Sequence, residues 1–248
     1  MPYNLIGDIH GRNAWRQLVR TDMINIFLGD YLDPYDRDNL QADSTEYDNL
    51  QDIIRFKQQH PETILLLGNH DLHYLWDEHY SRYNDEHAER YAQLIREHLH
   101  LFQAAYAIGD RVLVTHAGVT RPWLQLAGIS HQQSVSQLAE AICRCMSDEE
   151  SRHLFSVEST FYPDDSCGIS PTASPIWVRP HTLLDYGALT NHHGDTIYQV
   201  VGHTQIGQIM QFDSCVFVDC LGSVPQSLRI TFDAAGEPIF TPQPAKIQ

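Results

Sequence analysis

The sequence has 248 residues, of which 42% are hydrophobic, enough for a substantial core in one α/β domain. Its 32 acidic and 16 basic residues give a formal net charge of −16, and such an acidic surface repels the phosphate backbone of nucleic-acid polymers. No apolar run reaches the roughly 20 residues that cross a bilayer, and residues 1–6 lack the basic and apolar pattern of a signal peptide. We expect a soluble, cytoplasmic protein that binds neither nucleic-acid polymers nor membranes.

The first seventy residues alternate between short apolar runs and helical patterns. Leu5–Ile6, Ile24–Leu28 and Thr63–Leu67 are typical of buried strands. Helices are expected over Asn13–Arg20 and from Tyr47 to about His60. Strands that alternate with helices predict parallel pairing in an α/β sandwich.

The middle of the chain has a different pattern. Residues 72–100 and 121–155 look largely helical, and residues 159–175 contain several prolines and a glycine, as a long loop at the rim of a site does. We therefore expect one domain over residues 1–248 with helical insertions around 72–100 and 121–155. A hairpin is expected around Gly109-Asp110, and strands return at 197–201, 215–219 and 228–232.

The five cysteines form an odd set whose spacings match no zinc motif. We expect reduced thiols that pack as small apolar side chains. The five are Cys143, Cys145, Cys167, Cys215 and Cys220.

Polar, ligand-rich turns follow five of the apolar runs. Each turn alone is more often a simple turn, a helix cap or a buried histidine, but five in order are hard to obtain by chance. In open α/β sheets, sites form beyond the carboxyl ends of strands, so the five turns can converge on one place. They are Gly7-Asp8-Ile9-His10-Gly11, Gly29-Asp30-Tyr31-Leu32-Asp33, Gly68-Asn69-His70-Asp71, Thr115-His116-Ala117-Gly118 and Gly202-His203-Thr204.

The residue types in these turns suit metal ions. Carboxylate oxygen, imidazole nitrogen and amide oxygen together fit Mn, Fe or Zn better than Mg or Ca. Alternate residues of an extended segment point the same way, so Asp8 and His10 can bind one ion if residues 8–10 are extended.

The ordered set of turns resembles the calcineurin-like metallophosphoesterases. It is most similar to their phosphoprotein phosphatase branch and its bacterial relatives, which include symmetrical diadenosine tetraphosphatases. Gln205, where many other members carry a second histidine, also favours this branch. The resemblance runs from residue 5 to about 205 and implies a sandwich of two central β-sheets flanked by helices.

The resemblance also implies a role for each polar side chain. Two metal ions per chain are expected, with manganese first and iron or zinc as alternatives, and two cations roughly 3.5–4 Å apart can activate a bridging water. His70 is the expected general acid, and Asp33 the residue that orients it. The expected metal ligands are Asp8 and His10 for the first ion, Asp30 for both, and Asn69, His116 and His203 for the second.

The phosphate-binding residues depart from the family pattern. After the turn at Gly29–Asp33 the family usually has Arg-Gly, whereas this chain has Pro34-Tyr35. Arg37 is a candidate substitute. Trp177-Val178-Arg179 resembles a segment of the bacterial relatives and makes Arg179 the main candidate, because the planar guanidinium binds two phosphate oxygens at once. Asn69 is expected to contact the phosphate as well.

No other histidine is assigned to metal. Those in polar helical stretches and in the loop before Gly194 are expected to be exposed or at a rim. They are His60, His73, His79, His87, His98, His100, His192 and His193.

The leading interpretation is a phosphomonoesterase, with phosphorylated small molecules, nucleotides and phosphopeptides as candidate substrates and serine/threonine protein phosphatase activity among the options. The alternatives are a hydrolase of dinucleoside polyphosphates and a non-catalytic metal-binding scaffold. His70 and Asp33 argue against the scaffold, because neither is needed to hold metal, whereas Pro34 is in its favour.

Overall fold

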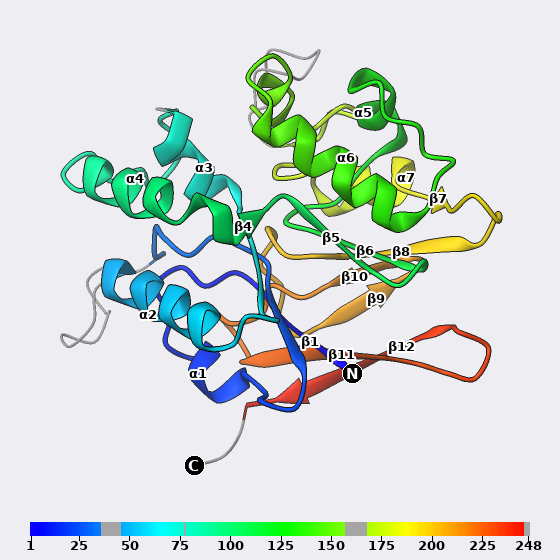
Figure 1. Ribbon diagram of the computed structural model, residues 1–248, viewed down its shortest axis with the longest axis horizontal. Coiled ribbons are helices and arrows are strands. Elements are labelled where there is room, and N and C mark those ends of the chain that lie inside the picture. Colours follow the sequence, from blue (N-terminus) through cyan, green and yellow to red (C-terminus); the bar gives the residue numbers. More distant parts are fainter. Residues whose placement is uncertain (36–45, 77, 157–167, 246–248) are drawn as a thin grey trace.

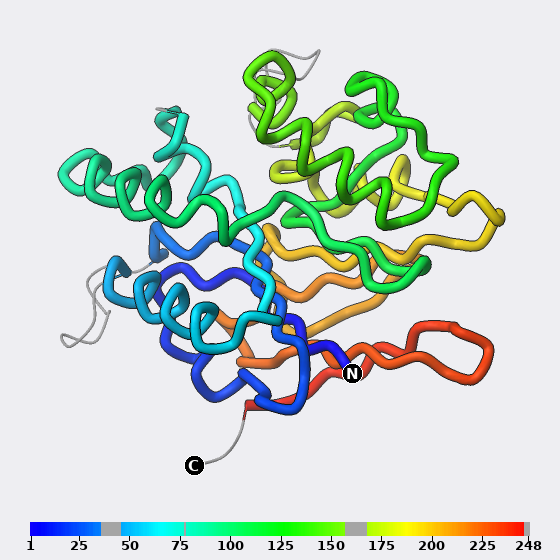
Figure 2. The backbone as a smooth tube through the Cα atoms, viewed as in Figure 1, coloured from blue at the N-terminus to red at the C-terminus, as the bar shows by residue number. Residues whose placement is uncertain are grey.

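The computed structural model describes residues 1–35, 46–76, 78–156 and 168–245 of the protein. Two β-sheets pack face to face, and helices cover their outer sides (Figure 1). The predicted sandwich of two sheets is therefore confirmed. Figure 2 follows the same chain path and shows that the C-terminal strands return to the sheet formed by the N-terminus.

The first sheet has a parallel core that is extended by an antiparallel hairpin. Its order is β12-β11-β1-β2-β3-β4, with β1 to β4 parallel and β11 antiparallel to both of its neighbours. The strands are β1 (Tyr3–Ile6), β2 (Ile24–Phe27), β3 (Ile64–Leu66), β4 (Phe102–Gln103), β11 (Gln226–Phe232) and β12 (Pro238–Pro244).

The second sheet also has parallel strands at its centre. Its order is β5-β6-β8-β10-β9, with β6, β8 and β10 parallel to one another and β7 paired to β8. The predicted hairpin around Gly109-Asp110 joins β5 to β6. The strands are β5 (Ala105–Ile108), β6 (Val112–Thr115), β7 (Leu189–Thr190), β8 (Thr196–Val201), β9 (Met210–Phe212) and β10 (Cys215–Phe217).

Alternation along the strands explains the layers. Successive side chains of a strand point to opposite faces, so Leu5 and Ile26 enter the core between the sheets with Val200 of β8. Their neighbours Ile6 and Phe27 point outward, into the core beneath the helices.

The helices lie on the outer faces of the sheets. On the first sheet, α1 (Trp15–Leu18) and α2 (Glu46–Gln59) pack against Phe27, which meets Trp15 edge to face at 5.7 Å. The upper right of Figure 1 shows α5, α6 and α7 over the second sheet. The remaining elements are α3 (Asn69–Trp76), α4 (Ala88–Glu97), η2 (Leu99–Leu101), α5 (Arg121–Leu126), α6 (Val135–Ser147), η3 (Arg152–Phe155) and α7 (Pro180–Tyr186).

The two predicted helical stretches are each interrupted. Between α3 and α4 the backbone turns, and Arg82 has a φ of 66°, which a right-handed helix cannot accommodate. Between α5 and α6, Gly128 has the same φ of 66°. Of the predicted loop at 159–175, residues 159–167 lie outside the described residues.

Strand β12 was not predicted because of its prolines. The segment contains three prolines, which disfavour a strand because proline has no N–H to donate to a neighbouring strand. They are Pro238, Pro242 and Pro244. An edge strand tolerates them, and β12 is at the edge of its sheet.

Four cysteines, Cys143, Cys145, Cys215 and Cys220, are free thiols, and Cys167 lies outside the described residues. Within the described ranges, none of the helices has the length and apolar character that a membrane span requires.

Candidate active site

The polar turns that follow β1, β2, β3, β6 and β8 meet at one end of the sandwich. Backbone hydrogen bonds tie them together: His10 N donates to Asp30 O at 2.6 Å, and Gly202 N donates to His116 O at 2.7 Å. The structure thus brings the six predicted metal ligands together, all of them buried: Asp8, His10, Asp30, Asn69, His116 and His203.

The first group of side chains surrounds His10. Its Nε2 lies 3.5 Å from Asp30 Oδ2 and 4.0 Å from Asp8 Oδ2. Its Nδ1 donates to the carbonyl oxygen of Leu32 at 2.9 Å. This bond leaves the lone pair on Nε2, directed at the two carboxylates.

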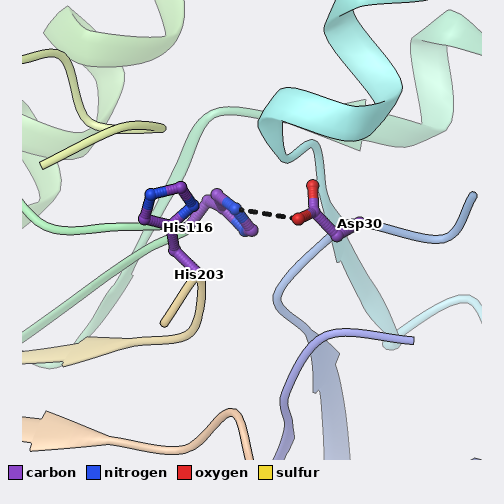
Figure 3. A group of neighbouring side chains, drawn as sticks. All are labelled: Asp30, His116 and His203. Atoms are coloured by element: carbon purple, nitrogen blue, oxygen red, sulfur yellow. Dashed lines mark ion pairs between the residues drawn. The ribbon is translucent and has the colours of Figure 1, made fainter. Parts of the chain in front are cut away.

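The second group shares Asp30 with the first. His116 Nε2 lies 3.4 Å from Asp30 Oδ2, as the dashed line in Figure 3 shows, and 3.1 Å from Asn69 Oδ1. His203 is beside His116 in the same view, with its Nδ1 3.0 Å from Asn69 Oδ1. His116 Nδ1 donates to Leu28 O at 2.8 Å, which fixes this ring as Leu32 fixes His10.

The electrostatics of the two groups fit bound cations. Burial and the neighbouring carboxylate of Asp219 raise the pKa of Asp8 well above its usual range. Burial opposes a charge on His116, but the carboxylates of Asp30 and Asp8 outweigh it and raise its pKa to about 10. His203 Nε2 is buried and has no hydrogen-bond partner in the part of the chain that the structure describes. Packed carboxylates and orphaned imidazole nitrogens are the donor set of a metal centre.

Left-handed backbone conformations occur throughout this site. The values of φ are 43° at His10, 49° at Asp30, 56° at Asp33 and 66° at His203. Each such residue costs about 1–3 kcal/mol, and this kind of strain clusters at functional sites. The extended conformation expected for residues 8–10 is therefore wrong, and His10 approaches Asp8 through a turn instead.

His70 and Asp33 form a hydrogen-bonded pair next to the metal-ligand groups. His70 Nδ1 lies 2.8 Å from Asp33 Oδ2, and the backbone N of His70 donates to Asp30 Oδ1 at 2.9 Å. Asp33 Oδ1 also accepts a bond of 2.5 Å from the Tyr74 hydroxyl. Burial alone raises the pKa of Asp33, but hydrogen bonds from His70 and His73 outweigh it and bring the pKa below its usual value.

The model of the calcineurin-like phosphoesterase family matches residues 1–207 of the chain. The chain belongs to this family. It is therefore a phosphoester hydrolase of a metal-dependent family, and the two groups around His10 and His116 are among its His/Asp groups that could hold metal ions.

Solved structures of two other proteins share the fold of this phosphoesterase. One is a cold-active protein-tyrosine phosphatase of a psychrophilic Shewanella species, with 16% identity and a TM-score of 0.59; the match covers 96% of this chain and 80% of that one. The other is a protein serine/threonine phosphatase from Saccharomyces cerevisiae that is similar to human phosphatase PP5, with 16% identity and a TM-score of 0.56 over 100% of this chain and 81% of that one. A comparison with curated protein sequences found no match.

Of the two arginines expected to bind phosphate, Arg179 is described by the structure and Arg37 is not. Arg179 of the phosphoesterase lies at the site, where its Nη1 donates to Thr204 Oγ1 at 3.3 Å, next to His203. Burial, the charge of His116 and then that of Arg179 lower the pKa of His203 well below its usual value. Arg37 lies outside the described residues. Pro34 is buried, and the Tyr35 side chain that follows it is 49% exposed.

The prediction for His73 is wrong. It is fully buried, with its Nε2 2.8 Å from Asp33 Oδ2, rather than exposed or at a rim. The signal was its spacing, since His73 follows His70 by three residues and a helix places such pairs on one face. The other histidines in question are exposed or half-buried, as expected.

Two buried carboxylates were not predicted as part of the site. Asp71 accepts backbone hydrogen bonds from Asp30, Tyr31 and Gly68 at 2.8–2.9 Å, and so joins the turns after β2 and β3. Asp219 is 1% exposed, and burial raises its pKa to about 6. Asp219 follows the apolar strand β10 as Asp8 follows β1, so the pattern that identified the other turns applies to it too.

Proposed function

We propose that this phosphoesterase hydrolyses phosphate monoesters with two metal ions bound at the centre. The observation that carries the proposal is the place of Asp30 between two ligand groups, with its Oδ2 3.5 Å from His10 Nε2 and 3.4 Å from His116 Nε2. One ion takes the first group and the other takes the second, with Asp30 shared. The first ligands are Asp8, His10 and Asp30, and the second are Asp30, Asn69, His116 and His203.

When bound, a pair of cations activates water for attack and neutralises charge on the phosphate. Manganese is the metal that we propose, with iron and zinc as alternatives, because all three accept carboxylate, imidazole and amide donors. The carbonyl bonds of Leu28 and Leu32 support the proposal, since each leaves the Nε2 of a histidine free to bind metal.

His70 donates the proton that the leaving oxygen needs. Its Nδ1 is held at 2.8 Å by Asp33, so Nε2 is the nitrogen that carries the proton to the substrate. Asp33 in turn is fixed by His73 and by Tyr74. These contacts support a preorganised acid, and they argue against the non-catalytic scaffold, because none of them is needed to hold metal.

Arg179 and the Asn69 amide bind the phosphate. Arg179 is bonded to Thr204, the neighbour of His203 in the chain, and is close enough to His203 to affect its pKa. Its guanidinium suits a phosphate because it donates to two oxygens at once. Arg37 remains a candidate for a second arginine.

The substrate class that we propose is a small phosphate ester. The net charge of −16 disfavours an acidic phosphoprotein, although two solved structures that share this fold are a tyrosine and a serine/threonine protein phosphatase. Phosphopeptide hydrolysis is therefore the first alternative, and dinucleoside polyphosphate hydrolysis is the second.

Turnover by the manganese-loaded protein across nitrophenyl phosphate, mononucleotides, phosphopeptides and dinucleoside polyphosphates tests this proposal. We expect hydrolysis of small monoesters and two manganese ions per chain by elemental analysis. A phosphopeptide preferred by about 100-fold in kcat/KM, worth about 2.7 kcal/mol, overturns the small-substrate proposal. A single bound ion overturns the two-metal mechanism.

A further inference from the structure

An arginine that the sequence did not single out lies against the proposed general acid. Arg82, in the segment between α3 and α4, donates from Nη2 to His70 Nε2 at 2.8 Å. Its guanidinium carbon is 3.8 Å from the centroid of the Tyr35 ring. The same ring meets His10 edge to face at 4.9 Å. Arg82 therefore reaches the centre of the site from outside the five turns.

This guanidinium lies beside the atom that the substrate phosphate must approach. His70 Nε2 is the atom from which the leaving oxygen takes its proton, so the phosphoryl group must come within a few ångströms of it. A donor that is 2.8 Å from Nε2 is within reach of the oxygens of that group. Arg179 lies beside His203, bonded to Thr204, so a second guanidinium borders the same site.

We propose that Arg82 binds the substrate phosphate and that Tyr35 positions it. The pair Pro34-Tyr35 stands where an Arg-Gly was expected, and it supplies an aromatic ring on which an arginine from another segment rests. Arg82 thus supplies the positive charge that Pro34 lacks. This proposal rests on the proposed function, since it concerns the same site.

The segment that carries Arg82 is anchored on both sides. Tyr80 packs edge to face on Trp177 at 4.8 Å, next to the turn that carries Arg179. Tyr83 stacks on Tyr74 at 4.7 Å, and Asn84 N donates to the Tyr74 hydroxyl at 3.0 Å. Arg82 itself has a φ of 66°, in the left-handed region where His10, Asp30, Asp33 and His203 also lie. Strain of this kind is retained where the surrounding structure fixes a functional side chain.

The contact with His70 shows which donor a phosphate would meet. The guanidinium of Arg82 donates to His70 Nε2 in the structure. A phosphate oxygen is a stronger acceptor than an imidazole nitrogen, so a bound phosphate takes over this donor and leaves His70 Nε2 facing the leaving oxygen.

The binding of inorganic phosphate to the manganese-loaded protein tests the role of Arg82. We expect Arg82→Ala to weaken the calorimetric Kd by about 10- to 100-fold, the loss when a charged hydrogen bond is left unmade. Arg82→Lys keeps the charge but not the planar fork, so its loss should be intermediate. Manganese content should be unchanged in both variants. Arg90→Ala is the matched control, because Arg90 also stacks on a tyrosine, 3.7 Å from the Tyr47 ring, but does so away from the site.

Conservative and disruptive changes at Tyr35 test its positioning role. Tyr35→Phe retains the ring and should bind phosphate as the wild type does. Tyr35→Leu removes the ring face and should weaken binding by about 3- to 10-fold, as expected for a lost cation–π contact. A merely structural role of the ring predicts that Tyr35→Leu loses unfolding free energy and manganese content along with phosphate binding, whereas a positioning role predicts a loss of phosphate binding alone.

Phosphate binding by Arg82→Ala that equals that of the wild type overturns the proposal. A rise in turnover in this variant overturns it too, because Arg82 is then only an obstruction of His70. The two proposals fail separately. If the wild type hydrolyses no ester, the proposed function is wrong, and the phosphate Kd of the Arg82 variants still decides the role of Arg82. If the wild type is active and the Arg82 variants bind phosphate as it does, the inference about Arg82 alone is wrong.

Discussion

Single side chains in this site are oriented by bonds to the backbone. His10 donates from Nδ1 to the carbonyl of Leu32, and His116 donates from Nδ1 to the carbonyl of Leu28. The two leucines follow and precede Asp30 in the chain by two residues each. Such a bond fixes both the tautomer and the angle of the ring, which a metal ligand requires. The chemistry of the site is therefore set by the turns as much as by the ligand types.

Substitution of the proposed general acid has a distinctive kinetic signature. We expect His70→Ala to lower turnover by about 10²–10⁴ on phenyl phosphate, because the leaving oxygen then departs without a proton. The loss should be much smaller on nitrophenyl phosphate, whose leaving group needs no proton. Steady-state kinetics on the two esters measures the difference, and manganese content should stay unchanged. Equal losses on both esters contradict the acid role.

The buried carboxylate of Asp33 makes stability depend on pH. Its pKa in the folded protein is lowered by the hydrogen bonds from His70 and His73, so it stabilises the fold above its unfolded pKa of about 3.9 and ceases to do so as pH falls through the folded value. Asp33→Asn should be less stable than the wild type at pH 5, and the gap in unfolding free energy should narrow below about pH 4. Urea denaturation of both proteins across this range measures the gap. A gap that widens in acid contradicts the assignment.

The sequence predicted which residues are candidate metal ligands, but it did not single out Arg82. The predicted metal ligands were recognisable because each follows an apolar strand, and the structure brings them together. Arg82 was not recognisable, because it lies among polar residues whose packing depends on Tyr74 and on Trp177, the latter far from it in the chain. The roles of all these residues remain predictions until the variants are measured.

At the scale of elements, most of the fold was predicted from the patterns of the strands. Short apolar runs in β1, β2 and β8 were enough to place the strands, and turns that follow parallel strands gather at one end of a sheet. Elements set by tertiary contacts were missed: β4 and β7 are two residues long, and β12 carries prolines that only a sheet edge tolerates. The two stretches predicted to be helical contain helices that are interrupted, and both their status as insertions and the single-domain organisation stay predictions.

Asp71 connects the turns after β2 and β3, and its removal should destabilise both. Three buried N–H groups, of Asp30, Tyr31 and Gly68, donate to its carboxylate. Asp71→Ala leaves them unpaired and should lower the free energy of unfolding by about 2–5 kcal/mol. Asp71→Asn retains one acceptor oxygen and should cost less. Chemical denaturation without added metal measures both variants, and an unchanged midpoint for the alanine variant contradicts this role.

At the scale of the whole molecule, the candidate centre joins the two sheets. Asp8, Asp30 and Asn69 come from turns after strands of the first sheet, whereas His116 and His203 come from turns after strands of the second. Asp30 and His116 meet across this boundary at 3.4 Å (Figure 3). Cations bound here therefore cross-link the sheets, in addition to neutralising buried carboxylates.

This arrangement predicts that manganese stabilises the fold as a whole. A ligand that binds only the native state adds about 2.7 kcal/mol to the free energy of unfolding at 100 times its Kd, so the melting temperature should rise with manganese concentration and fall on chelation. Asp30→Ala should abolish most of this gain, because the variant loses the ligand shared by both groups. His203→Ala and His10→Ala, one from each sheet, should each abolish part of it. Arg179→Ala is the control, since Arg179 binds phosphate rather than metal in this proposal. Thermal unfolding with and without manganese compares the five proteins, and a gain that survives intact in Asp30→Ala places the metals elsewhere.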